Sequence, residues 1–128
     1  MRLLVDTQPI IWAVEDPHQL RPNARPALAS GSNQLLISAA SIWEIAIKVG
    51  IAKLSLSLPY GQWMTKAVTD LGASILPITI EYADVQSKHP MRHRDPFDRL
   101  LAAQSVVESL TLVSGDRAFD QYGATRLW

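Results

Sequence analysis

Four acidic residues are spaced so that they could act together on one ligand. Asp6 and Asp116 each follow a short apolar run, whereas Glu44 lies within a largely apolar helical segment and Asp98 opens a second one. Carboxylates that crowd together repel one another, and their pKa values rise unless a cation neutralises them. Hard carboxylate oxygens without thiolates select Mg²⁺ or Mn²⁺, ions that support phosphodiester hydrolysis. The spacing therefore fits a metal-dependent nuclease, although it does not establish one.

Each acid also has a purely structural interpretation, and for any one acid taken alone we prefer it. Asp6 and Asp116 are placed to cap the helices that follow them. Glu44 is either the third residue of a capping box that begins at Ser41 or the partner of Lys48 four residues later. Only the convergence of all four acids would favour the metal site.

The segment around Asp98 predicts a helix with a well-defined beginning. Asp95 suits the N-cap, Pro96 suits the first helical position, and Asp98 then lies in the first turn. Apolar residues occupy most faces from Leu100 to Leu110, so we expect this helix to be covered on more than one side. The polar residues form a narrow stripe of Gln104, Ser105, Glu108 and Ser109. In the structural interpretation, Asp95 and Asp98 only cap the helix and interact with its dipole.

Cationic residues gather near these acids although the chain as a whole is neutral. They are Lys88, His89, Arg92, His93, Arg94, Arg99 and Arg117. We interpret them as contacts for substrate phosphate, with Arg99 and Arg117 as the best candidates and Lys48 and Arg94 as further ones. The alternative is a solvated surface run that offsets the acidic site. Thr7 and Ser114 flank the acids and could bind a metal-bound water, although hydroxyls at strand ends more often only cap.

Short apolar runs alternate with helical patterns along the whole chain. The runs lack period-two alternation, which is typical of a parallel sheet covered on both faces. The predicted strands are Leu3–Val5, Leu35–Ser38, Ser74–Leu76, Thr111–Ser114 and Thr125–Leu127. The predicted helices are Pro9–Val14, Arg21–Ser30, Ser41–Gly50, Pro59–Leu71, Thr79–Ser87, Pro96–Leu110 and Arg117–Tyr122. We therefore expect a three-layer α/β fold with ligands bound beyond the carboxyl ends of the strands.

Composition narrows the class of protein. The chain has 128 residues, 48% of them hydrophobic, so we expect one domain over residues 1–128 with a proper core. It has no cysteine, which excludes disulfides, thiolate zinc sites and thiol catalysis. Its formal net charge of +0 does not suggest nucleic-acid binding as a strongly basic chain would. Without a secretory signal or membrane span, it is expected to be soluble and cytoplasmic.

Four motifs occur in order along the chain: LLVDT at 3–7, SIWEIAIK at 41–48, DPFDRLLAAQ at 95–104 and LVSGD at 112–116. Together they resemble the motifs of PIN-domain ribonucleases, above all the VapC-type toxins of bacterial toxin–antitoxin pairs. The resemblance implies a short parallel sheet of strand order 3-2-1-4-5. It also implies that Asp6, Glu44, Asp98 and Asp116 are the catalytic metal ligands.

The resemblance carries further expectations about activity and partners. It implies a Mg²⁺- or Mn²⁺-dependent endoribonuclease that cuts RNA, forms a homodimer and is inhibited by a cognate antitoxin inserted near the active site. Two positions depart from the family pattern: Gln8 stands where relatives often have His, and Ser114 where Thr is more usual. Neither departure removes a carboxylate. We also expect the helix with Tyr60, Trp63 and Met64, together with the Glu44 helix, to form an antitoxin groove.

Two alternatives come from other classes of protein. A non-catalytic signalling or binding module of the receiver type also clusters acids beside a parallel sheet. It would need an acid after the third strand, where Leu76 and Pro77 stand, and a Lys after the fifth. A phosphatase with an aspartyl nucleophile would need a second acid two residues after Asp6, where Gln8 stands. Both alternatives are weaker than the nuclease.

Overall fold

A five-stranded, wholly parallel sheet forms the centre of this computed structural model, which describes residues 1–89 and 95–128. The strands are β1 (Arg2–Val5), β2 (Gln34–Ser38), β3 (Ser74–Leu76), β4 (Thr111–Val113) and β5 (Thr125–Leu127). Their order is β3-β2-β1-β4-β5, which confirms the expected order. Receiver modules have the order 2-1-3-4-5, so the receiver alternative is wrong for this chain.

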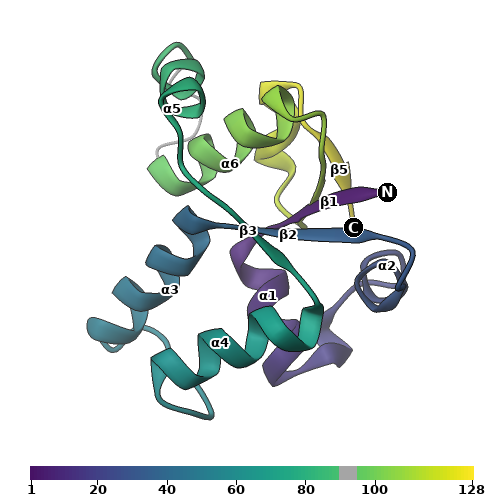
Figure 1. Ribbon diagram of the computed structural model, residues 1–128, viewed down its shortest axis with the longest axis vertical. Helices are drawn as coiled ribbons and strands as arrows, with labels where there is room; N and C mark the ends of the chain where they lie inside the picture. Colours follow the sequence, from purple (N-terminus) through teal and green to yellow (C-terminus); the bar gives the residue numbers. More distant parts are fainter. Residues whose placement is uncertain (90–94) are drawn as a thin grey trace.

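Helices cover the sheet on both faces, so the predicted three layers are confirmed (Figure 1). On one face lie α1 (Thr7–Glu15), α2 (Ala24–Ala29), α3 (Ala39–Gly50) and α4 (Tyr60–Leu71). On the other lie α5 (Ile80–Ser87) and α6 (Pro96–Val107). Two 3₁₀ turns, η1 (Pro17–Gln19) and η2 (Arg117–Tyr122), complete the described elements.

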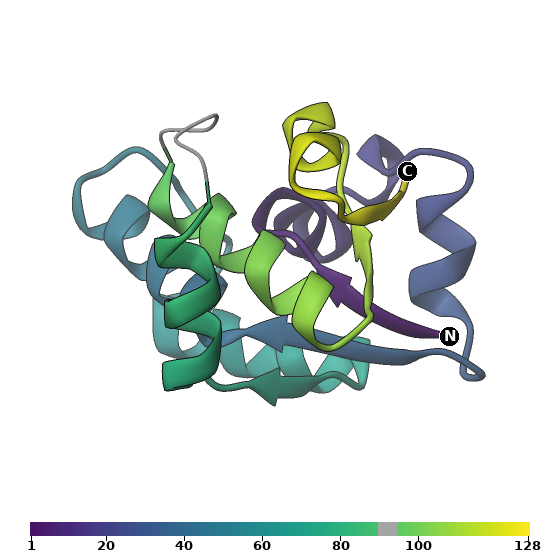
Figure 2. The same ribbon diagram turned by 90° about the horizontal axis from the view of Figure 1, so that it is seen from above.

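The central strand β1 contributes to two separate hydrophobic cores. Leu3 and Val5 face the larger core under α1, α3 and α4, and Leu4 faces the smaller core under α6. Seen from above, α6 lies over the middle of the sheet (Figure 2). Because both faces of β1 are dry, its residues are apolar without alternation, as the sequence predicted. Burying each such side chain fully is worth about 1.5 to 3 kcal/mol.

Two helices begin earlier than their sequences suggested, because each is capped by a residue at the end of the preceding strand or directly after it. Asp6 accepts a hydrogen bond from Thr7 N, so α1 begins at Thr7. Ser38 accepts from Ala40 N, so α3 begins at Ala39. Ser41 is therefore inside the helix, and the predicted capping box from Ser41 to Glu44 is wrong.

Two other helices are shorter than predicted. The helix expected over 21–30 is reduced to α2, which contains Pro26 in its first turn, where a proline is tolerated. The helix expected to reach Leu110 ends at Val107, and Ser109 adopts a left-handed φ of 53°. The predicted start of α6 is confirmed, with Asp95 as N-cap and Pro96 in the first turn.

The polar stripe on α6 is not a solvent-facing stripe along its whole length. Gln104 is 0% exposed, and its Nε2 donates to the carbonyl of Pro77 at 3.3 Å. Ser105 is equally buried, and its hydroxyl donates to the carbonyl of Ala102. Each of these buried side chains donates to a carbonyl group, whereas Gln104 Oε1 has no hydrogen-bond partner among the described residues.

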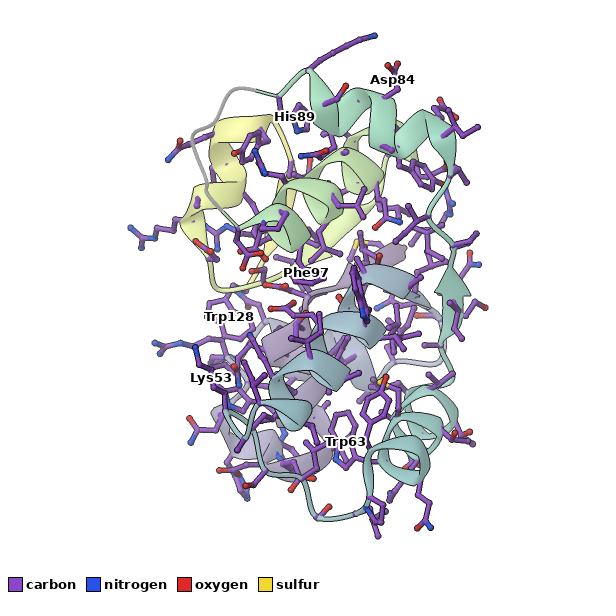
Figure 3. The ribbon with its side chains drawn as sticks, turned by 90° about the vertical axis from the view of Figure 1, so that its left-hand side faces the viewer. Lys53, Trp63, Asp84, His89, Phe97 and Trp128 are labelled. Carbon is purple, nitrogen blue, oxygen red and sulfur yellow. The ribbon has the colours of Figure 1, made fainter. Side chains whose placement is uncertain are left out.

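The aromatic face of α4 belongs to the core. Trp63 is 0% exposed and is enclosed among the helices on one side of the sheet (Figure 3). Trp63 and the 6% exposed Met64 are therefore core residues and cannot be exposed anchors of the antitoxin groove expected on this helix. α4 ends where Gly72 adopts a left-handed φ of 60°. Among residues 1–89 and 95–128, no helix has both the length and the hydropathy that crossing a membrane requires.

Glu15 at the end of α1 fixes both the loop before α4 and α4 itself. Its Oε1 accepts hydrogen bonds from Ser57 N at 3.1 Å, Ser57 Oγ at 2.7 Å and Trp63 Nε1 at 2.6 Å. Glu15→Ala removes the acceptor and leaves the indole N–H unpaired, so we expect the free energy of unfolding to fall by about 1 to 2 kcal/mol.

Denaturant unfolding followed by circular dichroism measures this change. The matched control is Asp70→Ala, which breaks only the exposed ion pair of Asp70 with Lys66 and should cost less than about 0.5 kcal/mol. Equal losses in the two variants would contradict this account of Glu15.

Candidate functional site

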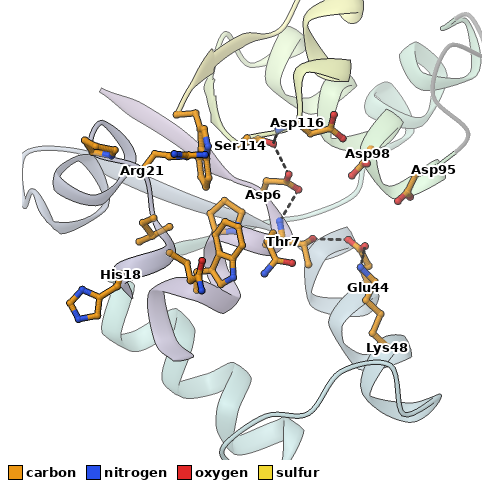
Figure 4. Close-up of a pocket in the computed structure, with 18 residues that line it drawn as sticks. Asp6, Thr7, His18, Arg21, Glu44, Lys48, Asp95, Asp98, Ser114 and Asp116 are labelled. Atoms are coloured by element: carbon orange, nitrogen blue, oxygen red, sulfur yellow. Dashed lines mark hydrogen bonds and ion pairs between the residues drawn. The ribbon is translucent and has the colours of Figure 1, made fainter. Parts of the chain in front are cut away.

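The predicted acids line one cavity beyond the carboxyl ends of β1 and β4 (Figure 4). β1 and β4 are parallel neighbours, with Val5 in register with Val113. The residues that follow them therefore emerge at the same edge of the sheet. The cavity has a volume of about 870 Å³, and its acidic lining consists of Asp6, Glu44, Asp95, Asp98 and Asp116.

Asp6 is the most constrained of these acids. Only 8% of it is exposed, Thr7 N donates to its Oδ1 at 2.7 Å, and Ser114 Oγ donates to its Oδ2 at 2.7 Å. Burial raises the pKa of Asp6 from 3.8 to about 6, with smaller contributions from the negative charges of Glu44 and Asp116. The two hydrogen bonds oppose this shift without cancelling it. The fold therefore holds a carboxylate at a place that disfavours its charge.

Ser114 connects the two acids at the strand ends. Its hydroxyl donates to Asp6 and also accepts a hydrogen bond from Asp116 N at 3.0 Å. Asp116 in turn accepts from Ala118 N at 2.9 Å and caps η2. The fully buried Ser114 thus fixes the side chain of one acid and the backbone of the other.

Glu44 is held from both sides of its carboxylate. Thr7 Oγ1 donates to its Oε1 at 2.6 Å, and Lys48 Nζ lies 2.8 Å from its Oε2. Ser41 Oγ lies 3.1 Å from the same Thr7 oxygen. Of the two structural interpretations given to Glu44, the pair with Lys48 is confirmed. Thr7 therefore contacts both Asp6 and Glu44, through its backbone and its side chain respectively (Figure 4).

Lys48 lies in the acidic field of the cavity. Burial lowers the pKa of Lys48, but the contact with Glu44 and the charges of Asp95 and Asp98 outweigh that effect, so its pKa is raised. Asp95 caps α6 by accepting from Phe97 N at 2.9 Å. The capping roles predicted for Asp6, Asp95 and Asp116 are thus all present. A carboxylate has about four lone-pair sites, so capping does not exclude binding a cation as well.

Only some of the residues predicted to contact substrate phosphate line the cavity. Lys48 lines the cavity, whereas Arg99 in α6 and Arg117 in η2 are not among its lining residues. Arg94 lies outside the described residues, as do Arg92 and His93. The cavity instead includes His18 and Arg21, which the sequence interpretation missed. Their only sequence signal is position, because they follow the helix that begins at the carboxyl end of β1.

The donor set suits a hard divalent cation in chemistry and location. All the acidic donors are carboxylates, and Asp6, whose pKa is raised by burial and by neighbouring charges, would gain from a neutralising cation. The carboxylates lie farther apart than the ligands of a bound metal ion. In the described parts of the chain, no three acidic or histidine side chains form a group that could hold an ion. Side chains from separate elements would have to close around the ion.

Comparison with solved structures identifies the same fold elsewhere. VapBC2 from Rickettsia felis, solved bound to a DNA fragment from their promoter, has a similar chain with a TM-score of 0.69 and 18% identity, over 98% of this chain and 97% of that one. FitAcB from Neisseria gonorrhoeae gives a TM-score of 0.61 and 21% identity, over 97% and 95%. VapBC-1 from nontypeable Haemophilus influenzae gives 0.63 and 16%, over 98% and 96%. At these identities the likeness shows the fold alone.

The family itself is shown by sequence. No curated protein matches the chain as a relative. A model of the PIN domain, however, matches residues 3–124, and this range includes every acid that lines the cavity. PIN domains are typically nucleases. The chain therefore belongs to the PIN-domain family.

Proposed function

We propose that this chain is a Mg²⁺- or Mn²⁺-dependent endoribonuclease. One observation carries the proposal: in a PIN-domain chain, carboxylates from four separate parts of the fold line one cavity at the edge of the sheet. These carboxylates are Asp6, Glu44, Asp98 and Asp116. The motifs SIWEIAIK and DPFDRLLAAQ, which resemble those of VapC-type ribonucleases, support RNA as the substrate.

Asp6, Glu44, Asp98 and Asp116 are the residues that would hold the ion. When bound, such an ion supplies a nucleophile from a coordinated water and stabilises the leaving oxygen of a phosphodiester. Hydrogen bonds from Ser114 and Thr7 restrict rotation of Asp6, and Thr7 with Lys48 restricts Glu44. Lys48 keeps a positive charge beside these acids, where it can contact substrate phosphate.

We further propose that the chain is the toxin of a toxin–antitoxin pair. The structurally similar chains come from VapBC and FitAB complexes, the class to which the sequence motifs also point. The outer face of α3 and its C-cap support a protein partner, because Trp43 in the helix is 62% exposed and Ile51 at the cap is 57% exposed. The Trp43 ring packs edge-on against Phe97, with centroids 5.7 Å apart, beside the first turn of α6. An antitoxin on this face would lie next to the cavity.

We also propose that the chain forms a homodimer, which light scattering of the purified protein tests.

The nuclease proposal predicts the loss of cleavage in Asp98→Asn. The substitution keeps the size of the side chain but removes the charge of a proposed ligand. Changes outside the ligand sphere cost about 10- to 100-fold, so we expect loss of a ligand to exceed about 100-fold. The assay follows cleavage of a mixed RNA pool with Mg²⁺, with Mn²⁺ and with chelator.

The matched control is Asp84→Asn, which removes an exposed acid on α5 that pairs with Lys88. This variant should cut at the parental rate. Unchanged cleavage by Asp98→Asn, or full activity in chelator, would overturn the proposal.

The raised pKa of Asp6 predicts how stability depends on pH without metal. Between about pH 4 and pH 6 the folded chain holds a proton at Asp6 that the unfolded chain has released. The contribution of Asp6 to the free energy of unfolding is therefore fully present below about pH 4. It is lost as the pH rises through about 6. Asp6→Asn cannot ionise, so from about pH 5 to about pH 7.5 its free energy of unfolding should gain about 1 to 2 kcal/mol relative to the parent.

Denaturant unfolding in chelator at several pH values measures the difference in free energy of unfolding between the parent and Asp6→Asn. Asp120→Asn is the control, because contact with Arg126 lowers the pKa of Asp120 and this acid stays ionised over the range. The difference in free energy of unfolding between Asp120→Asn and the parent should not vary with pH. A constant difference for Asp6→Asn as well would show that Asp6 is not the titrating group.

The proposed antitoxin face predicts an effect of Trp43→Ser. Loss of an exposed aromatic anchor at the centre of an interface costs about 2 kcal/mol or more, or about 30-fold in affinity. The tagged chain, purified from its own cells, should lose its co-purifying partner. Ile80→Ser, which changes an 89% exposed residue on α5, is the control and should retain it. Equal recovery in both variants would remove α3 from the interface.

A further inference from the structure

The cavity is larger than a metal site alone requires. Its volume is about 870 Å³, whereas a cavity needs only roughly 10 to 15 Å³ on the same measure to hold one water. Besides the acids, its lining includes Trp12, Trp128 and Arg21. A volume in this range accommodates an organic ligand of substantial size. The cavity therefore has room for a substrate group beside the reacting phosphate.

The indole of Trp128 lies against the backbone that carries one of the acids. A Cβ atom added at Gly115 would lie 2.8 Å from Cε2 and 2.9 Å from Nε1 of Trp128, so the ring fits only because residue 115 is glycine. Gly115 directly precedes Asp116 in the chain. The backbone carbonyl of Trp128 accepts a hydrogen bond from Asn23 Nδ2 at 3.1 Å, which holds the residue in place. An aromatic ring is thus fixed next to the acidic end of the cavity.

Trp12 and Trp128 form a pair rather than two isolated side chains. Their ring centroids are 5.8 Å apart and their planes are inclined by 32°. Both pack against the larger core on one side, yet both also line the cavity. Packing against the core explains why one side of each indole is buried. It does not account for two indoles in the wall of a cavity whose other members are largely charged or polar.

Arg21 adds a cation on the side of the acids opposite Lys48, and His18 lies on the same side as Arg21 (Figure 4). Arg21 is exposed, and its guanidinium makes no hydrogen bond or ion pair within residues 1–89 and 95–128. Trp128 lies on the molecular face seen in Figure 3. The cavity lining therefore combines carboxylates, two indoles and a further cation, and the indole of Trp128 lies against Gly115, beside Asp116.

We propose that this cavity binds single-stranded RNA, with an unstacked base on Trp128 and a neighbouring phosphate of the same strand at Arg21. Aromatic rings bind bases of single strands by stacking, and a guanidinium binds phosphate. The inference deepens the proposed function, because it places a nucleotide next to the phosphodiester that the carboxylates would act on. It also predicts that paired bases, whose faces are covered, bind poorly at this site.

The test is binding of a short, fluorescently labelled single-stranded oligoribonucleotide, followed by anisotropy in chelator and again with Mg²⁺. Trp128→Leu removes the aromatic face but keeps an apolar side chain on Gly115, and Trp128→Phe restores a ring. We expect Trp128→Leu to weaken binding at least about fivefold and Trp128→Phe to recover most of it. An abasic oligomer of the same length should bind the parent and Trp128→Leu equally.

Arg21→Ala tests the phosphate contact separately. It should weaken the normal and abasic oligomers alike and reduce the salt dependence of binding by about one phosphate contact. Arg25→Ala removes the same charge from α2, outside the cavity lining, and should have the smaller effect. Thermal unfolding of each variant, with and without Mn²⁺, verifies that the fold and the carboxylates are intact.

The outcomes separate this inference from the nuclease proposal. Equal binding by the parent and Trp128→Leu, or an equal loss with the abasic oligomer, would overturn the base contact even if cleavage is metal-dependent. Binding that depends on Trp128 and on the bases would support the inference even if no RNA is cut. If RNA is cut, Trp128→Leu should raise KM more than it lowers kcat, since it leaves the carboxylates in place.

Discussion

A negative charge buried at the end of the central strand is the constraint on which the rest of this site depends. β1 is paired on both sides and covered on both faces, so the residue that follows it leaves the sheet with little exposure. Asp6 occupies that position, and the fold surrounds it with donors from Thr7 and Ser114. The other acids then arrive from elements that pack next to β1. The parallel sheet thus determines which charges must share one space.

The same groups that build the fold also reduce the repulsion between these charges. Asp6, Asp95 and Asp116 each cap a helical element, where backbone N–H groups and the helix dipole favour a negative charge. Glu44 does not cap a helix, and its charge is instead offset by the ammonium group of Lys48. The capping and metal-site interpretations are therefore compatible. Capping explains how several carboxylates remain close together before a cation is present.

Much of the fold could be predicted because its signals are local. The strands are apolar runs covered on both faces, and Asp95 with Pro96 marks the start of α6 unambiguously. The errors arise where tertiary contacts decide. Ser38 rather than Ser41 caps α3 because β2 continues into that helix without a turn. Sequence spacing could bring Asp6 and Asp116 to one edge, but it could not place Arg21 there.

The raised pKa of Asp6 shows that its charge carries a cost that capping alone does not require. Asparagine caps helices about as well as aspartate, so a sequence selected only for this fold could carry Asn at position 6. With a pKa raised from 3.8 to about 6, the ionised carboxylate costs about 3 kcal/mol at neutral pH. That is a large fraction of the stability of a typical domain. A cation bound by the neighbouring acids would reverse this cost, because it would turn the least favourable charge of the fold into a ligand. The structural interpretation explains how Asp6 is held, and the proposed metal site would explain why the residue is an acid.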